Sequence, residues 1–167
     1  MPNYCFYSMK IKGAKKSCEE WLYRMRYYNH NNHFHRIFEA DIIVEGGYEN
    51  DYYMVISGNC AWSLESCCRT SGYAGADLFA INSKELRIIM EAYSEEPGCC
   101  FQEHYVYKKG ECEIDECVEW KEMYWNEDEY SFEEWKEEFD IPDEVTEDDL
   151  DENYYTIGGF EKWDFEI

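Results

Sequence analysis

The sequence predicts an α+β fold: a ferredoxin-like antiparallel sheet with two helices on one face, extended by an acidic helical and strand C-terminal elaboration. Three observations lead to this prediction: the chain length, the abundance of aromatic residues, and the order of strand-like and helix-like segments. A chain of 167 residues forms about one domain. Its sixteen Tyr, nine Phe and six Trp supply the apolar surface that disordered chains lack, so the chain is expected to fold despite its charge.

The first half of the chain has the pattern strand, helix, strand, strand. Three segments alternate between apolar and polar residues and are predicted strands: 4–11, 36–44 and 52–57. Between the first two, apolar residues recur at helical spacing and predict a helix over 18–28, with Leu22 and Met25 on its buried face. Ser17 is the predicted N-cap of this helix. Residues 59–80 give no firm assignment.

The next part of the chain supplies a second helix and two strands. Asn82 is a predicted N-cap, and Leu86, Ile89 and Met90 form one apolar stripe, so a helix is expected over 83–95. Two strand-like runs follow, 100–107 and 111–120, joined by a turn that ends in a glycine. The order strand-helix-strand-strand-helix-strand, with one extra strand, is typical of the ferredoxin-like fold.

The C-terminal part carries its own structural signals. Ser131 is a predicted N-cap for a short helix in which Phe132, Trp135 and Phe139 share one face. A second short helix is predicted from Thr146, and a final strand over 160–167. Acidic disordered tails lack aromatic residues at such spacings. We therefore expect two parts, a ferredoxin-like domain over 1–120 and an acidic elaboration over 121–167 that packs on it.

The net charge of −23 is distributed unevenly. Residues 1–110 carry 14 acidic and 12 basic side chains, whereas residues 111–167 carry 24 acidic and 3 basic ones. Direct binding to nucleic acid is not expected, because it needs Lys and Arg to displace counterions. Anionic membrane surfaces are disfavoured for the same reason. No run of about 20 apolar residues is available to span a bilayer.

The N-terminus and the cysteines predict a cytoplasmic protein. The first five residues lack the basic start and apolar run of a signal peptide. Nine cysteines in a chain that is not exported are expected to stay reduced, and many of them to pack as small buried hydrophobes.

Two short motifs carry a family resemblance. The chain opens with Met-Pro-Asn-Tyr-Cys before a predicted strand and Gly13, and the run Tyr-Ser-Glu-Glu-Pro-Gly-Cys-Cys-Phe over 93–101 precedes a turn with Gly110. These motifs resemble the YubB-like ferredoxin-fold family of plasmid and phage proteins, with Tyr4 where the family commonly has Trp. The resemblance covers about residues 1–120 and implies a mobile-element protein with a ferredoxin-like core. It implies no activity, and the acidic part lies outside it.

Two chemical alternatives stay open. His30, His33 and His35 are spaced so that neutral imidazoles could converge on zinc, although a polar loop between a helix and a strand is the favoured interpretation. A thiol nucleophile assisted by His104 is the second alternative, against simple packing of the thiols. Its candidate cysteines are Cys60, Cys67, Cys68, Cys99 and Cys100. Acidic pairs are so abundant that none stands out for acid–base catalysis, and no glycine-rich phosphate loop is present. No catalytic residue, metal or cofactor is therefore predicted.

The charge contrast favours a protein-binding function. A folded surface of carboxylates can mimic the phosphate backbone and occupy a basic groove. The predicted partner is a basic nucleic-acid-binding protein of the host, such as a CRISPR nuclease or a restriction enzyme. The protein would then be a phage or plasmid inhibitor in the host cytoplasm, of the anti-CRISPR or anti-restriction type. The predicted contact residues are Tyr130, Glu133, Glu134, Glu137, Glu138, Asp143, Glu144, Glu147, Asp148, Asp149, Asp151, Glu152 and Tyr154. The alternatives are a non-catalytic accessory binding module whose acidity only aids solubility, and a small metal-dependent protein.

Overall fold

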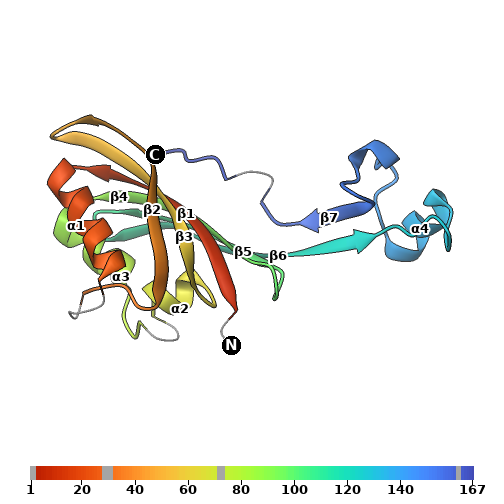
Figure 1. The fold of residues 1–167 in the computed structure, drawn as a ribbon, viewed down its shortest axis with the longest axis horizontal. Helices are drawn as coiled ribbons and strands as arrows, with labels where there is room; N and C mark the ends of the chain where they lie inside the picture. The colour runs from red at the N-terminus through yellow and green to blue at the C-terminus, as the bar shows by residue number, and fades with distance from the viewer. Residues whose placement is uncertain (1–2, 28–31, 71–73, 161–162) are drawn as a thin grey trace. The chain divides into compact units, whose positions relative to one another are not determined.

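The computed structural model describes residues 3–27, 32–70, 74–160 and 163–167. It divides the chain into two compact units, unit 1 (Met1–Val118 and Phe160–Ile167) and unit 2 (Glu119–Gly159). The strands are β1 (Tyr4–Gly13), β2 (Ile37–Tyr48), β3 (Asp51–Ala61), β4 (Ile89–Glu96), β5 (Phe101–Lys108), β6 (Glu111–Tyr124) and β7 (Tyr154–Gly158). The helices are α1 (Lys15–Arg26), α2 (Leu64–Cys68), α3 (Leu78–Leu86), α4 (Phe132–Phe139) and the 3-10 helix η1 (Glu147–Asp149) (Figure 1).

The predicted fold class, a ferredoxin-like sheet with two helices on one face, is wrong. The structure is mostly a seven-stranded antiparallel sheet with few and short helices, in the order β2-β3-β1-β4-β5-β6-β7. Strand β6 runs from unit 1 into unit 2, where it pairs with β7 from Trp120 to Tyr124. The sheet therefore continues past the five strands that the sequence pattern predicted for residues 1–120.

The error has a local origin in residues 83–95. Helix α3 begins earlier, capped by Asp77 rather than Asn82, and it ends at Leu86 because Arg87 takes a left-handed conformation. Residues 89–96 then form β4, which pairs with β1 on one side and β5 on the other. A central strand that is covered on both faces does not alternate between apolar and polar residues. Nearly all residues of β4 are buried. Because its apolar residues do not alternate with polar ones, the sequence pattern predicted a helix there instead of a strand.

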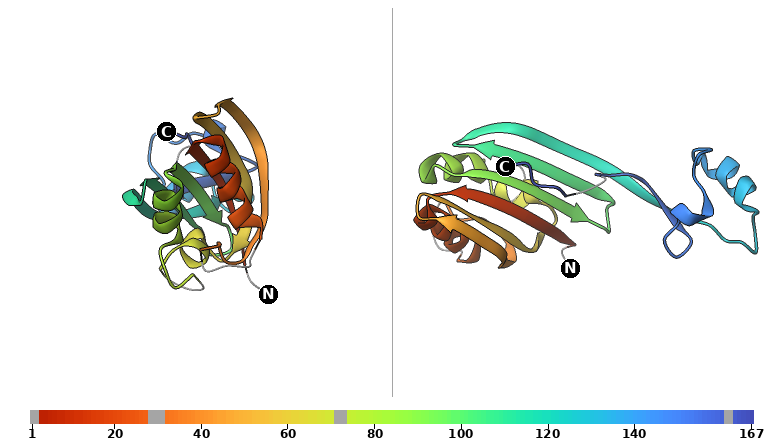
Figure 2. Two further views of the ribbon diagram at one scale, coloured as in Figure 1. Left: turned by 90° about the vertical axis from the view of Figure 1, so that its left-hand side faces the viewer. Right: turned by 90° about the horizontal axis from the view of Figure 1, so that it is seen from above.

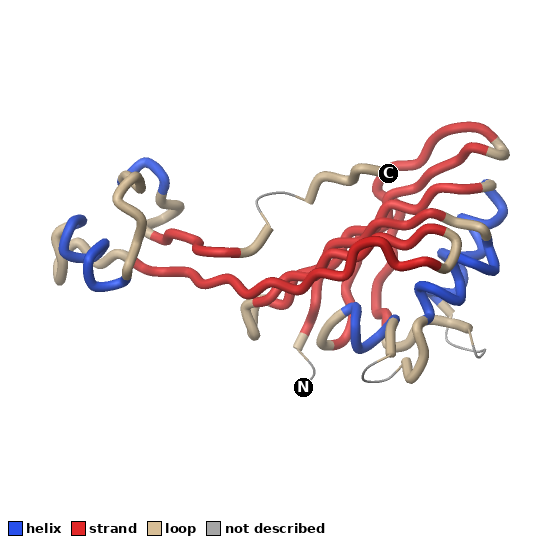
Figure 3. Tube along the Cα trace, turned by 180° about the vertical axis from the view of Figure 1, so that it is seen from behind, coloured by secondary structure: helices blue, strands red, loops and turns tan. Residues whose placement is uncertain are grey.

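The core of unit 1 lies between the sheet and helices α1, α2 and α3, which cover one face (Figure 3). The ring centroids of Trp21 and Phe79 are 6.1 Å apart and nearly parallel, and Phe34 packs against both. Arg24 of α1 forms a 2.8 Å ion pair with Glu85 of α3, which fixes the two helices against each other. We call this side of the sheet the helix-covered face and the opposite side the outer face.

Some of the residues predicted to lie in the core are fully buried, and others are only half-buried. Leu22, Met25 and Met90 are buried, as predicted. Leu86 and Ile89 are only half-buried, and Ile88 takes the buried position instead. The reason is the change from helix to strand after Leu86, which redistributes the side chains between two faces.

Unit 2 has a small core of its own. Trp135, Ile141 and Val145 are buried together, and the half-buried side chains around them come from both strands and from the connecting segments. The helix predicted from Thr146 is only the single 3-10 turn η1, and the predicted strand over 160–167 is not formed in the described residues of that range. Among the residues that the structure describes, no helix has the length and apolar character needed to cross a bilayer.

Candidate protein-binding site

Helix α4 organises the acidic unit, and its start follows from the sequence. Ser131 is the N-cap, and Glu134 completes a capping box: its carboxylate accepts hydrogen bonds from the Ser131 backbone N–H at 3.0 Å and from the Ser131 hydroxyl at 2.6 Å. These bonds lower the pKa of the Glu134 carboxyl, so the charge that closes the cap is retained in mild acid. The predicted cap at Ser131 is confirmed.

The apolar face of α4 anchors the helix to the rest of unit 2. Trp135 is fully buried, and its indole N–H donates to the Tyr124 carbonyl at 3.0 Å. Phe132 stacks on Trp135 with centroids 5.6 Å apart, and Trp125 packs edge-on against Phe132. The aromatic residues that the sequence placed on one helix face therefore hold a folded support for the charged side chains.

Lys136 is the one basic residue of α4, and it is turned inward. Its side chain is buried, and its ammonium group donates to the carbonyls of Asp143 at 3.1 Å and Val145 at 3.3 Å. It also lies 3.3 Å from the exposed carboxylate of Glu133. These hydrogen bonds hold the chain segment after α4 against the helix. The charge of Lys136 therefore stabilises the interior of unit 2 and is not presented on its surface.

Every acidic residue of unit 2 is exposed. Residues 119–159 contain 17 Asp and Glu and two Lys, and only one of those lysines, Lys121, is exposed. The seventeen exposed acids are Glu119, Glu122, Glu127, Asp128, Glu129, Glu133, Glu134, Glu137, Glu138, Asp140, Asp143, Glu144, Glu147, Asp148, Asp149, Asp151 and Glu152. Unit 2 therefore presents an almost uniformly negative surface, carried by a folded core.

The structure groups some of the predicted contact residues around two hollows. One, of about 510 Å³, is lined by Glu129, Tyr130, Glu134, Glu137 and Glu138. The other, also about 510 Å³, is lined by Phe132, Glu133, Lys136, Asp143, Val145, Thr146, Glu147 and Asp148. Sequence reasoning missed Glu129, which enters the first hollow from the turn before α4, and the inward role of Lys136. The run of acids on both sides of Tyr130 was the available signal for Glu129.

The remaining predicted contact residues lie elsewhere on unit 2. Asp149 accepts hydrogen bonds from the backbone and hydroxyl of Thr146, and these bonds lower the pKa of its carboxyl. Asp151 forms an isolated bridge with Tyr154, whose ring packs against Tyr124 with centroids 5.0 Å apart. Glu144 and Glu152 line neither hollow. Asp149 and Asp151 therefore stabilise the local backbone conformation and also contribute negative charge.

Among the residues that the structure describes, the candidate histidines do not form a metal-binding group. His33 is buried, and its Nδ1 contacts the Tyr27 carbonyl, while burial lowers the pKa of His35. His30 lies outside the described residues. Among those that are described, no three His, Cys, Asp or Glu side chains are grouped so that they could hold a metal ion.

In the thiol alternative, no candidate cysteine in the described part of the chain lies against the predicted base His104, whose ring nitrogens contact Glu91 and Glu116 instead. Cys60, Cys67 and Cys68 are buried, and burial raises the pKa of the Cys68 thiol well above its usual value. The pKa of Cys67 is lowered, first by a hydrogen bond from Cys60, but its sulfur is enclosed in the core. His104 instead lies on the outer face of the sheet, 3.0 Å from Glu91.

The two remaining candidate thiols lie near the turn between β4 and β5. Cys99 is exposed and Cys100 half-buried, and the Cys99 thiol donates a hydrogen bond to the Glu96 carboxylate, which raises the pKa of Cys99. A raised pKa reduces the thiolate fraction, which is the reactive form.

Comparison with protein-family models, with curated proteins and with solved structures finds no match for the chain.

Proposed function

We propose that unit 2 binds a basic groove of a host nucleic-acid-binding protein in place of nucleic acid, and thereby inhibits it. The observation that carries the proposal is the exposure of all 17 acidic side chains of unit 2, on a folded core, beside a single exposed base. The target class is a defence enzyme such as a CRISPR nuclease or a restriction enzyme. The short motifs similar to plasmid and phage proteins support the mobile-element origin.

The density of charge on α4 suits a groove that holds nucleic acid. The helix has eight residues and carries Glu133, Glu134, Glu137 and Glu138. At about 1.5 Å rise per residue it is about 12 Å long, so it presents about one carboxylate per 3 Å. One strand of a DNA duplex presents a phosphate about every 3.4 Å. The two spacings are close enough for the same Lys and Arg side chains to serve both.

The loss of fold stability caused by so many like charges also supports a binding role. Seventeen like charges on 41 residues repel one another and weaken the fold of unit 2. The buried Trp135 and the inward-turned Lys136 offset that repulsion locally. A surface whose acidity only aided solubility would need far fewer acids than this. The accessory-module alternative therefore explains less of the structure.

A charge-neutralised variant tests the proposal. We choose E129Q, E137Q, E138Q and D140N, because these residues are exposed while Glu134, which closes the helix cap, and Glu133, which pairs with Lys136, stay in place. The matched control removes the same number of charges from exposed acids of unit 1: E19Q, E49Q, D51N and E111Q. Both variants are expected to unfold at the same urea concentration as the parent or at a slightly higher one.

The readout is DNA cleavage by an enzyme captured on the full chain from cells that carry an RNA-guided nuclease or a restriction enzyme. The unit 2 variant should lose inhibition by at least about tenfold, because clustered charges act together where single rim charges contribute little. The unit 1 variant should inhibit as the parent does. Equal inhibition by both variants, or capture of no nucleic-acid-binding protein, would contradict the proposal.

A further inference from the structure

The outer face of the sheet in unit 1 is covered by the end of the chain. We call residues 160–167 the covering segment; the structure describes Phe160 and residues 163–167 of it. The right-hand view of Figure 2 shows this blue segment running along the strands of unit 1. Its described residues form no strand, so they add nothing to the backbone ladder of the sheet. Side chains of the outer face hold it instead.

Those side chains bind the main chain of the covering segment. The Phe160 N–H donates to Gln102 Oε1 at 2.6 Å, and the N–H groups of Glu166 and Ile167 donate to Glu91 Oε2 at 2.6 and 3.2 Å. The Lys10 ammonium group donates to the Ile167 carbonyl. Strands β1, β4 and β5 therefore each contribute a polar side chain aimed at backbone groups.

Tyr93 adds a further contact to the backbone. Its hydroxyl lies 3.3 Å from the Asp164 carbonyl and 3.4 Å from Glu91 Oε1, so it can donate its proton to either oxygen. Burial, followed by the charge of Glu91, raises the pKa of Tyr93 to about 12. The hydroxyl therefore remains a donor throughout the neutral range.

The side chains of the segment alternate between sheet and solvent. Trp163, Phe165 and Ile167 are half-buried, whereas Asp164 and Glu166 are exposed. The Tyr93 ring lies parallel to Trp163 with centroids 6.0 Å apart and edge-on to Phe165 at 5.8 Å. His104 stacks on Tyr93 at 4.0 Å and so stiffens this platform. The outer face thus recognises an extended backbone with an apolar side chain at every second position.

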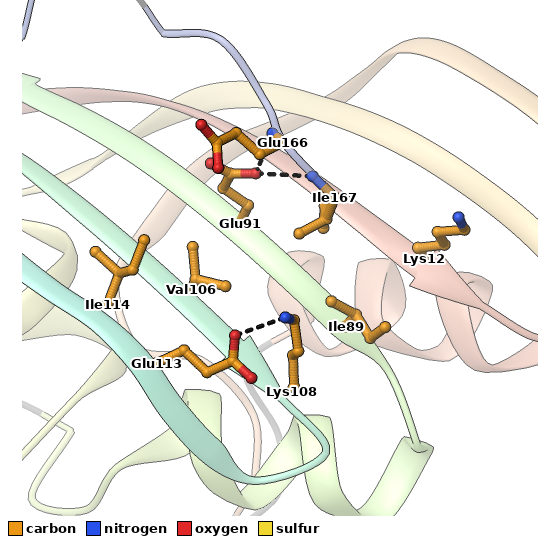
Figure 4. A pocket seen from close by; sticks show the side chains of 9 residues that line it. All are labelled: Lys12, Ile89, Glu91, Val106, Lys108, Glu113, Ile114, Glu166 and Ile167. Carbon is orange, nitrogen blue, oxygen red and sulfur yellow. Dashed lines mark hydrogen bonds and ion pairs between the residues drawn. The ribbon is translucent and has the colours of Figure 1, made fainter.

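The recognition surface continues beyond Ile167 into a pocket of about 290 Å³ (Figure 4). Its apolar lining includes Ile89, Val106 and Ile114, and Lys12 stands at its edge. The Lys108–Glu113 ion pair, at 2.6 Å, closes another side. The pocket has room for an aliphatic side chain.

The buried carboxylate of Glu91, which lies in the groove, has a contact with His104 as well as with the covering segment. The Glu91 side chain is only 1% exposed. Its Oε1 lies 3.0 Å from His104 Nε2, whereas the covering segment binds the other oxygen, Oε2. The contact with His104 therefore does not involve the covering segment. Gln102, Lys10 and Tyr93 are able to bind water. Departure of the segment therefore leaves no buried carboxylate unpaired, which makes exchange for another segment feasible.

We propose that the outer face of unit 1 is a binding groove for an extended peptide segment of a partner protein, with apolar side chains at alternate positions, two of them aromatic. The covering segment occupies the groove as an internal competitor. The covering segment belongs to the same chain as the groove, so its effective concentration there is high, and a partner segment has to overcome it. The groove lies in unit 1 and its function is independent of the proposed role of unit 2.

The test uses a fluorescein-labelled synthetic peptide with the sequence of residues 160–167 and the full chain carrying W163A and F165A. These changes remove the rings that dock on Tyr93, and we expect the remaining backbone hydrogen bonds to be too weak to hold the segment in the groove. Fluorescence anisotropy should show saturable binding to this variant and at least about tenfold weaker binding to the parent chain. A peptide with D164N and E166Q should bind as well as the original, because those side chains face solvent. A peptide lacking both aromatic rings should not bind.

Two further arms separate binding from misfolding. Adding Y93A or E91Q to the vacated chain should abolish peptide binding, while thermal unfolding shows that each chain remains folded. On the unaltered chain, excess unlabelled peptide should accelerate hydrogen exchange of the Glu166 and Ile167 amides. Absence of saturable binding to the folded, vacated chain, binding that ignores Glu91 and Tyr93, or unchanged exchange at saturating peptide would each overturn the proposal.

Discussion

At the scale of single residues, buried carboxylates organise unit 1. Glu103 lies on the helix-covered face and accepts hydrogen bonds from the Leu64 and Glu65 backbone N–H groups at 2.8 and 3.1 Å, so it caps helix α2. The Tyr105 hydroxyl donates to it at 3.0 Å, and Ser94 also donates. Sequence inspection could not find this role, because Glu103 is about forty residues from the helix that it caps and no local pattern links them.

The buried carboxyl of Glu103 predicts how the stability of the fold changes with pH. Burial raises the pKa of its carboxyl in the folded protein above the unfolded value of about 4.3, so the folded state holds the proton more tightly. Stability contributed by this group is present below that pH and is lost as the pH rises through the raised pKa. Glu103→Gln removes the titration.

Urea unfolding of the parent and Glu103→Gln from pH 4 to pH 8 checks this prediction. The variant should gain stability relative to the parent as the pH rises, by about 1.4 kcal/mol for each unit that separates the two pKa values. A difference that stays flat, or that shifts in favour of the parent, would show that the four donors keep the carboxyl at or below its usual pKa.

At the scale of elements, strand β4 is the decisive case. Met90 lies on the helix-covered face and is fully buried, whereas Leu86, near the end of α3, is only half-buried. Met90→Ala should cost about 2–5 kcal/mol, as for other buried large-to-small changes. Leu86→Ala should cost about 1–2 kcal/mol, because less apolar area is returned to water. Equal losses in urea unfolding would favour the continuous helix that the sequence pattern predicted.

Local signals predicted some features correctly and others wrongly. The alternation in β1 and the N-cap at Ser131 are set by residues that are neighbours in the chain, and both are confirmed. The predicted N-caps Ser17 and Asn82 lie inside α1 and α3, which are capped by Ala14 and Asp77. Elements defined by distant contacts were missed. Strand β4 is covered by helices on one face and by the covering segment on the other, so its burial does not alternate. The alternating residues 163–167 are apolar at every second position, as in a strand, but they bind outer-face side chains rather than a backbone edge.

At the scale of the whole molecule, the charge contrast between the two parts of the chain was readable from composition, and the candidate site follows from it. Composition could not show that Lys136 turns inward or that every acid of unit 2 faces solvent. Those two facts require the core around Trp135. The proposed mimicry of a phosphate backbone specifies a charge pattern rather than a particular groove.

The most direct test of the account is competition for the captured partner between the full chain and a fluorescein-labelled DNA duplex of random sequence. Anisotropy is measured at several salt concentrations. If unit 2 takes the place of nucleic acid, the chain displaces the duplex, its affinity falls steeply with salt, and E129Q/E137Q/E138Q/D140N makes that dependence shallower. A ternary complex in which the partner holds the duplex and the chain together, with an affinity that does not respond to salt, would contradict the account.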